Sequence, residues 1–252
     1  PPRQPNHLGL TWVLLLAGSG WACADEVAVA VAANFSAPMQ KIAAAFTQDT
    51  GHKALLSFGA TGKFYAQIVH GAPFGVLLAA DESTPQKLAQ QGLGEDATRM
   101  TYATGRLVLW SRQSGVVDAQ GKVLERTDWH HLAVANPKLA PYGVAAMQTI
   151  DKLGVRARIN DRIVLGENIA QTYQFAASGN AELGFVALSQ VIDNGRLREG
   201  SAWVVPTDMH SPIRQDAIVL GPGRNNPAAT ALMQYLRSDK ARAVMESYGY
   251  EF

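Results

Sequence analysis

Apolar residues along the chain recur at two spacings, which together predict strands that alternate with helices. Residues 27–33 form a continuous apolar run of strand length, and apolar side chains in residues 37–51 recur every three or four positions, the period of a helix. Strands that alternate with helices predict an α/β fold with largely parallel sheets, in which ligands bind beyond the carboxyl ends of the strands. The same strand-then-helix order recurs at 54–58 with 63–70, 75–80 with 84–91, 132–135 with 142–153, and 183–187 with 188–194.

Two extended segments divide this pattern and predict two lobes. Residues 101–115 and 206–220 both have strand-like composition, and a second set of strand–helix units lies between them. Two helical patterns, at 227–237 and 239–247, close the chain. We interpret the middle of the chain as one lobe inserted into the other, with a cleft between them; a single large sheet with a long loop is the alternative. The expected division is lobe 1 at residues 25–104 and 211–252, and lobe 2 at residues 105–210.

The first 24 residues have the pattern of a secretory signal peptide. An arginine precedes an apolar run over residues 8–17, and small residues at 22–24 precede a cleavage site expected after Ala24. The run is shorter than the 18 or so apolar residues of a membrane-spanning helix. We therefore expect export to the periplasm, with a lipid anchor at Cys23 as the alternative. Cys23 is the chain's only cysteine, so the mature chain would be stabilised by its core without disulfides.

Composition and motifs exclude several classes of function. The chain has 252 residues and a net charge of +1, and no run of lysine or arginine marks a nucleic-acid surface. The HExxH, CxxC, GxSxG and GxGxxG motifs are absent, and no two histidines are spaced to hold a metal on one helix face. Ser178 and Ser189 lie in no activating motif. We expect neither an enzyme nor a cofactor, and no metal held directly by side chains.

The segment SFGATGKFYAQIVHG, residues 57–71, has some features of a nucleotide phosphate loop. That motif needs a glycine where Ser57 stands and a hydroxyl where Phe64 stands, so its spacing fails twice. A strand-like run, a flexible turn and a helix remain, and the free backbone N–H groups at the start of such a helix attract anions. The segment therefore predicts part of an anion site without nucleotide specificity.

Four turns follow predicted strands, and each precedes a helical pattern: residues 33–36, 59–62, 141–143 and 168–170. If the turns converge, they offer backbone N–H groups together with the neutral donors Asn34, Thr61 and the Tyr142 hydroxyl, a set that suits a tetrahedral dianion. A cage of neutral donors without a carboxylate selects by geometry and disfavours protonated phosphate. The alternative is that each turn is an ordinary helix cap. Lys63 is left outside the expected site because a lysine at a helix surface is usually solvated.

Three motifs at these turns, GATGKFYAQI, GAPFGVLLAAD and NPKLAPYG, resemble the periplasmic molybdate-binding proteins of bacterial ABC transporters. The resemblance covers the whole mature chain and implies a type II-like periplasmic-binding-protein fold. In that fold each lobe is a mixed, mostly parallel sheet flanked by helices, and the ligand cleft lies between the lobes. It implies capture of molybdate, and of tungstate, and delivery of the ion to a membrane permease. We expect a monomer, because a shuttle must close around its ligand. The ligand residues that the resemblance implies are Ala33, Asn34, Thr61, Tyr142 and, through its backbone N–H, Ile169.

Two positions depart from the family pattern. Ala187 stands where other members have a tyrosine, so that contact should be absent and Tyr142 should compensate. Gly75 stands where the family commonly has aspartate, and a glycine in a regular strand costs about 0.5–1 kcal/mol of stability. The remaining alternatives are a binding protein for sulfate, phosphate or an organic anion, and an exported hydrolase on the same scaffold.

Overall fold

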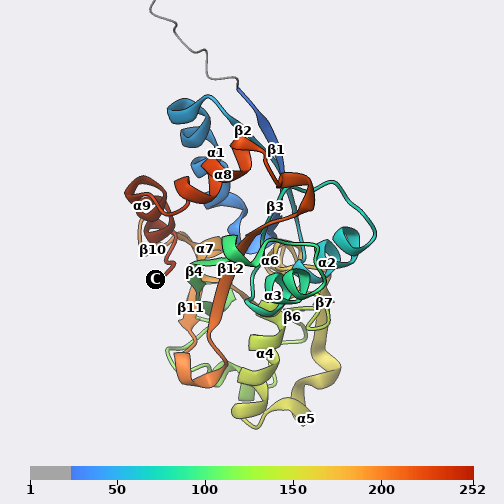
Figure 1. Ribbon diagram of the computed structural model, residues 1–252. Coiled ribbons are helices and arrows are strands. Elements are labelled where there is room, and N and C mark those ends of the chain that lie inside the picture. The colour runs from blue at the N-terminus through green and yellow to red at the C-terminus, as the bar shows by residue number, and fades with distance from the viewer. Residues whose placement is uncertain (1–23) are drawn as a thin grey trace, which may run out of the picture.

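Two five-stranded sheets form the framework of the protein (Figure 1), a computed structural model that describes residues 24–252. The predicted signal peptide and Cys23 therefore lie outside the described residues, apart from Ala24. The first sheet has the order β2-β1-β3-β12-β4 and the second has the order β11-β5-β8-β6-β7. In each sheet one strand, β12 or β5, runs opposite to the other four. The predicted α/β architecture with two mixed, mostly parallel sheets is confirmed.

The strands of the first sheet are β1 (Glu26–Ala32), β2 (Lys53–Gly59), β3 (Val76–Leu78), β4 (Met100–Gly105) and β12 (Ile213–Val219). Helices cover both of its faces because both faces are apolar. Val29 and Val31 pack against α1 (Ser36–Thr50), α8 (Pro227–Tyr235) and α9 (Asp239–Ser247). Ala30 and Leu77 point to the other face, where they meet α2 (Thr61–Val69) and α3 (Ser83–Gln90).

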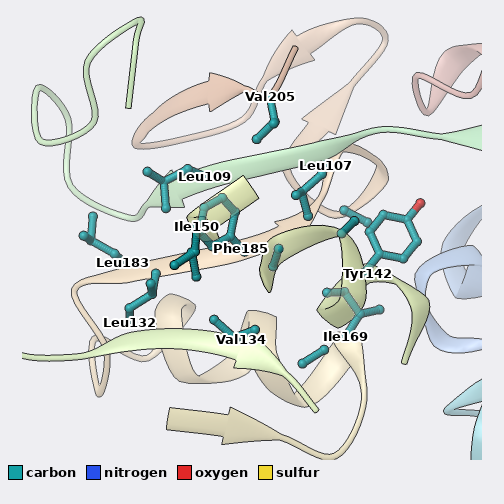
Figure 2. Close-up of a cluster of buried hydrophobic side chains, with 14 of the residues drawn as sticks. Leu107, Leu109, Leu132, Val134, Tyr142, Ile150, Ile169, Leu183, Phe185 and Val205 are labelled. Carbon is teal, nitrogen blue, oxygen red and sulfur yellow. The ribbon is translucent and has the colours of Figure 1, made fainter. Parts of the chain in front are cut away.

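The strands of the second sheet are β5 (Leu107–Ser111), β6 (Leu132–Ala135), β7 (Ile163–Gly166), β8 (Leu183–Ala187) and β11 (Ser201–Val204). One face packs against α4 (Pro141–Lys152) and α5 (Arg156–Ile159), and Figure 2 shows the leucine-rich cluster between them. The other face meets α6 (Ile169–Ala177) and α7 (Leu188–Val191). The Tyr142 ring lies at the edge of the cluster in Figure 2, and its hydroxyl points away from the apolar side chains.

The chain crosses between the sheets at the two segments predicted to be extended. It leaves β4 at Gly105 and enters β5 at Leu107, and it returns from β11 to β12 through residues 205–212. Glu251, the residue before the C-terminal Phe252, forms an isolated antiparallel bridge with Thr104 beside the first crossing. Both crossings and the chain's C-terminus therefore lie close together.

Several predicted boundaries were wrong for local reasons. The helix predicted at 188–194 ends at Val191, because Ile192–Asp193 (β9) pairs with Arg196–Leu197 (β10) in a hairpin. The two residues of that hairpin turn, Asn194 and Gly195, both have positive φ, as a tight hairpin turn requires. The extended segment predicted at 206–220 includes a short 3-10 turn, Thr207–Met209, before β12 begins. Within residues 24–252, no helix combines the length and the apolar character needed to cross a membrane.

Candidate anion-binding site

The four turns singled out in the sequence meet around one small cavity. Ala33, Asn34, Thr61, Tyr142 and Ile169 all line it, and each is at most 6% exposed. The cavity has a volume of about 10 Å³, whereas pockets for organic ligands measure roughly 300–1,000 Å³. A space of this size suits a compact ion. The structure brings all five residues together, and their part in binding remains a prediction.

The turns meet because the strands before them are parallel and in register. Ala32 at the end of β1 lies beside Gly59 at the end of β2, and Ala135 of β6 lies beside Gly166 of β7. The chain turns at these ends and enters helices, among them α2, α4 and α6. The N–H groups in the first turn of a helix have no partner within the helix, and the helix dipole makes that end positive. Several such ends facing one cavity favour an anion.

Thr61 has a hydroxyl proton available for a ligand. Its Oγ accepts a hydrogen bond from the backbone N–H of Ala80 at 3.0 Å. Since a hydroxyl both accepts and donates, the Thr61 proton is left to another acceptor. Thr61 is also the first residue of α2, so that its backbone N–H lacks an intrahelical partner.

Ile169 can contribute only through its backbone. Its side chain packs in the core of the second sheet, and it is the first residue of α6. The Asn168 side chain caps this helix by accepting a hydrogen bond from the Gln171 N–H at 2.9 Å. The cap holds the start of α6 in place, and the N–H of Ile169, a lining residue, has no partner within the helix.

Asn34 and Tyr142 belong to a buried hydrogen-bond network that the sequence did not reveal. The Asn34 amide nitrogen donates to Gln215 Oε1 at 2.7 Å and to Tyr250 Oη at 2.9 Å. The Tyr142 hydroxyl donates to the same Gln215 oxygen at 3.1 Å. Ser189 Oγ donates to the Asn34 carbonyl at 2.8 Å. Sequence reasoning missed Gln215, Tyr250 and Ser189 as neighbours of the site. Gln215 stands between Arg214 and Asp216 in β12, so no pattern in that strand marks it as buried.

Burial keeps the phenols of this network protonated. It raises the pKa of Tyr142 and of Tyr102 well above the usual value, and it raises the pKa of Tyr250 as well. A desolvated phenolate is unfavourable because the charged form loses its hydration. The hydroxyls therefore act as hydrogen-bond donors at any physiological pH.

Charged side chains stay outside the cavity lining. Lys63 pairs with Glu167 at 2.7 Å, and both side chains are exposed. Arg214, which could have held a carboxylate ligand, lines a larger neighbouring pocket of about 450 Å³ and lies 3.5 Å from Glu82. Within the described part of the chain, no residue lining the small cavity carries a charge, and no group of acidic, histidine or cysteine side chains is arranged to hold a metal ion.

Close packing explains the departure from the family pattern at Gly75, and the structure places the other departure, Ala187, outside the cavity lining. Gly75 lies just before β3 and beside Gly223, and a Cβ at residue 75 would come within 2.7 Å of Val27 Cγ2. The predicted cost of a strand glycine does not apply to this position, which has no room for a side chain. Ala187 ends β8 and is fully buried, and it is not among the residues that line the cavity.

Comparisons with known proteins agree with this geometry. Residues 27–251 match a family model described as bacterial extracellular solute-binding protein. The chain is 56% identical over 229 residues to the molybdate-binding protein ModA of Azotobacter vinelandii, with 91% of each protein covered. It is 46% identical over 248 residues to ModA of Rhodobacter capsulatus, with 98% of this chain and 97% of that protein covered. The solved structure of the Azotobacter vinelandii periplasmic molybdate-binding protein has a TM-score of 0.87 and 40% identity, and the match covers 90% of this chain and 99% of that one.

Proposed function

This chain belongs to the bacterial extracellular solute-binding proteins and is a homologue of the ModA molybdate-binding proteins, and we propose that it captures molybdate in the cavity formed by the four turns. It is a binding protein and not an enzyme, and it has the α/β fold of its periplasmic relatives. The observation that carries the proposal is the convergence of Ala33, Asn34, Thr61, Tyr142 and Ile169 on one buried space.

The donors of the cavity account for selectivity. Backbone N–H groups at three helix starts and the Thr61 hydroxyl can all donate to the oxygens of a tetrahedral dianion. Since the lining has no carboxylate, a protonated phosphate would bury a proton without an acceptor. Cage width separates the larger molybdate from sulfate. Tungstate, which differs little from molybdate in size, binds in the same cage.

Closure of the two lobes around the ion allows its delivery to a membrane permease. Lobe 1 comprises residues 25–104 and 211–252, lobe 2 comprises residues 105–210, and the cavity takes donors from both. An ion that bridges the lobes favours the closed form by its differential affinity, and a shift from 1:99 to 99:1 needs about 5.5 kcal/mol. The permease of an ABC transporter recognises the surfaces that closure brings together, and the ion passes to it.

The cellular location, the oligomeric state and the lack of a cofactor belong to the same proposal. The protein acts in the periplasm as a monomer, exported by the signal peptide at residues 1–24, and it needs no cofactor besides its oxyanion cargo. The family of periplasmic relatives supports the location. The compact cavity supports a single small ligand per chain.

A thermal-shift titration of residues 25–252 tests the proposal. Molybdate, tungstate, sulfate and phosphate are added to separate samples. A ligand at about 100 times its Kd stabilises the folded state by roughly 2.7 kcal/mol. For a chain of this size each kcal/mol raises Tm by about 2–4 °C. We expect a shift of several degrees with molybdate and tungstate and none with sulfate or phosphate.

Two outcomes would contradict the proposal in different ways. A shift with sulfate or phosphate of equal size would refute the selectivity of the cage. A cooperative melting transition that none of the four ions moves would refute oxyanion binding altogether, and a shift with an organic anion would then replace it.

A further inference from the structure

Gln215 is a fully buried amide whose polar atoms meet three partners around the cavity. Its side chain is 0% exposed, and it lies on β12, the returning crossing strand. The pairing of β12 with β4 shifts register between Gln215 and Asp216, which leaves Tyr102 of β4 without an opposite residue. Such bulges redirect side chains, and here Gln215 Nε2 donates to Tyr102 Oη at 2.9 Å. A buried amide with its oxygen and nitrogen both bonded is held firmly in one orientation.

A backbone carbonyl fixes the direction of the bonds that Gln215 makes. Tyr102 Oη lies 2.9 Å from the Ala79 carbonyl oxygen, which can only accept, so the Tyr102 proton points there. Tyr102 Oη is then an acceptor, and the Gln215 nitrogen must face it. The Gln215 oxygen therefore faces Asn34 and Tyr142, and both of them donate to it.

A second carbonyl fixes the other end of the network. The Asn34 carbonyl accepts from Tyr250 Oη at 2.8 Å and from Ser189 Oγ at 2.8 Å. The Tyr250 oxygen is thus the acceptor for the Asn34 amide at 2.9 Å. Both amide hydrogens of Asn34 are used, one by Gln215 and one by Tyr250, and this holds the residue at its side chain and at its backbone.

Gly105 provides the space in which the Tyr142 hydroxyl meets Gln215. A Cβ at residue 105 would come within 2.0 Å of Tyr142 Oη and 3.0 Å of Gln215 Oε1. The hydroxyl comes from α4 beside the second sheet, and Gln215 belongs to the first sheet. Their bond therefore joins the two halves of the protein next to the cavity.

We infer that Gln215 is a positioning residue for the anion cavity: its oxygen holds the Tyr142 proton until an oxyanion accepts it, and keeps the Asn34 amide fixed throughout. This rests on the proposed function. When the Tyr142 proton turns to a bound dianion, the Gln215 oxygen still accepts from Asn34 and is not left unsatisfied. The exchange therefore leaves no buried polar group without a partner, which would otherwise disfavour the bound state.

Gln215→Glu tests this role through pH. A neutral glutamic acid has the same layout as glutamine, because its O–H can donate to Tyr102 and its carbonyl can accept from Asn34 and Tyr142. An ionised glutamate places two acceptors and a negative charge there, so that it retains the Tyr142 proton and repels the dianion. Burial raises the pKa of a carboxyl group, which brings this change into an accessible pH range.

Few other groups near residue 215 titrate in that range. The tyrosines of the network have raised pKa values through burial. Asp216, the next residue on β12, bonds to Thr101 and pairs with Arg99 at 3.2 Å. The pKa of Asp81, also near Tyr102, is raised by burial. The other charged groups beside the network are Asp216, Arg99, Asp81 and the ion pair of Arg106 with Glu251, which follow Gly105 and Tyr250 in the chain. The wild type shares all of them.

The measurement is the Kd for molybdate by calorimetry at about pH 6 and about pH 8.5, for the wild type, Gln215→Glu and Gln148→Glu. Gln148 lies on α4 outside the network. Gln148→Glu is therefore the control, because it adds the same negative charge to the helix that carries Tyr142. We expect Gln215→Glu to bind about 10- to 100-fold more weakly at the higher pH and to recover to within about threefold of the wild type at the lower pH. The wild type and Gln148→Glu should keep one affinity at both pH values.

Tyr102→Phe is the second variant, and it tests the positioning role of Gln215 if Gln215→Glu fails to fold. Tyr102 does not line the cavity. Without the Tyr102 hydroxyl, the Gln215 amide group can rotate and exchange its oxygen and nitrogen, so the affinity for molybdate should fall by about 3- to 10-fold. An unchanged affinity in Tyr102→Phe, or a pH-independent affinity in Gln215→Glu, would overturn the inference. If the wild type does not bind molybdate, the proposed function fails. The positioning of residue 215 can then still be tested by the Tm of Gln215→Glu without ligand, which should be lower, relative to the wild type, at the higher pH.

Discussion

Thr61 illustrates how one side chain can serve both the fold and the ligand. Its oxygen supports the Ala80 N–H, and its proton is left for a partner in the cavity. The sequence could predict Thr61 as a donor because it follows a strand and precedes a helix. Asn34 was expected to donate for the same reason, but its amide hydrogens are bonded to Gln215 and Tyr250, so only its backbone N–H is left for an ion. The sequence could not predict Gln215, because the direction of that side chain depends on a register shift between two strands far apart in the chain.

At Thr61 we predict that Thr61→Val weakens molybdate binding by about 10-fold or more, since a hydrogen bond to a charged group contributes roughly 1.5–3 kcal/mol. Thr61→Ser keeps the hydroxyl and should retain most of the affinity. Calorimetric titration of both variants measures the difference. Equal affinities for the valine and serine variants would show that the hydroxyl does not bind the ion.

At the scale of elements, the pattern of apolar residues was a good guide wherever a helix or strand is buried along its length. It predicted the start of α2 and α4 to within two residues, because strand, turn and helix follow one another closely there. It failed at α7, where the positive φ of Asn194 and Gly195 allows a hairpin that no apolar spacing reveals. The convergence of the four turns follows from parallel strands, and it was therefore predictable as a hypothesis.

Helix caps near and far from the cavity should differ in their effect on binding. Asn168 caps α6 at the cavity, and Asn226 caps α8 by accepting from the Ala228 N–H at 2.9 Å. Replacing either by alanine should cost about 1 kcal/mol of folding stability. Only Asn168→Ala should also weaken molybdate binding, because it loosens the helix start that presents the Ile169 N–H.

Urea unfolding gives the stability of the two cap variants, and calorimetry gives their affinities. The alanine variant at residue 226 is the matched control for a lost cap. If both variants lose stability and neither loses affinity, the start of α6 is not part of the binding site.

At the scale of the whole molecule, contacts across the cavity mouth connect the two halves. The Gly62 N–H donates to the Leu139 carbonyl at 2.9 Å, and Lys63 pairs with Glu167 at 2.7 Å. We did not expect Lys63 to belong to the site. Its ion pair with Glu167 nevertheless connects the two halves of the protein. Its partner could not be foreseen, because the two residues lie far apart in sequence and on different sheets.

We predict that breaking the pair between Lys63 and Glu167 speeds release of molybdate. The pair is exposed and contributes about 0–1 kcal/mol, so Lys63→Gln or Glu167→Gln should raise the dissociation rate by no more than about fivefold. The double variant should be no faster than either single one, because they remove the same contact. Stopped-flow measurement of release gives the three rates.

The pair between Lys240 and Asp49 is the matched control for this test. It has the same 2.7 Å separation but joins α9 to α1 on one side of the cavity. Lys240→Gln should leave the release rate unchanged. Additive effects of the Lys63 and Glu167 substitutions would show that these side chains act separately and not as a contact across the mouth.

The neutral lining of the cavity has a consequence for the medium in which the protein works. Dissolved salt largely screens the attraction between exposed charges that are more than about 8–10 Å apart at moderate ionic strength. A buried site that holds its ion with N–H and O–H dipoles is largely protected from this screening, because counter-ions cannot enter a space of about 10 Å³ beside the ligand. The affinity should therefore change little between dilute and saline surroundings.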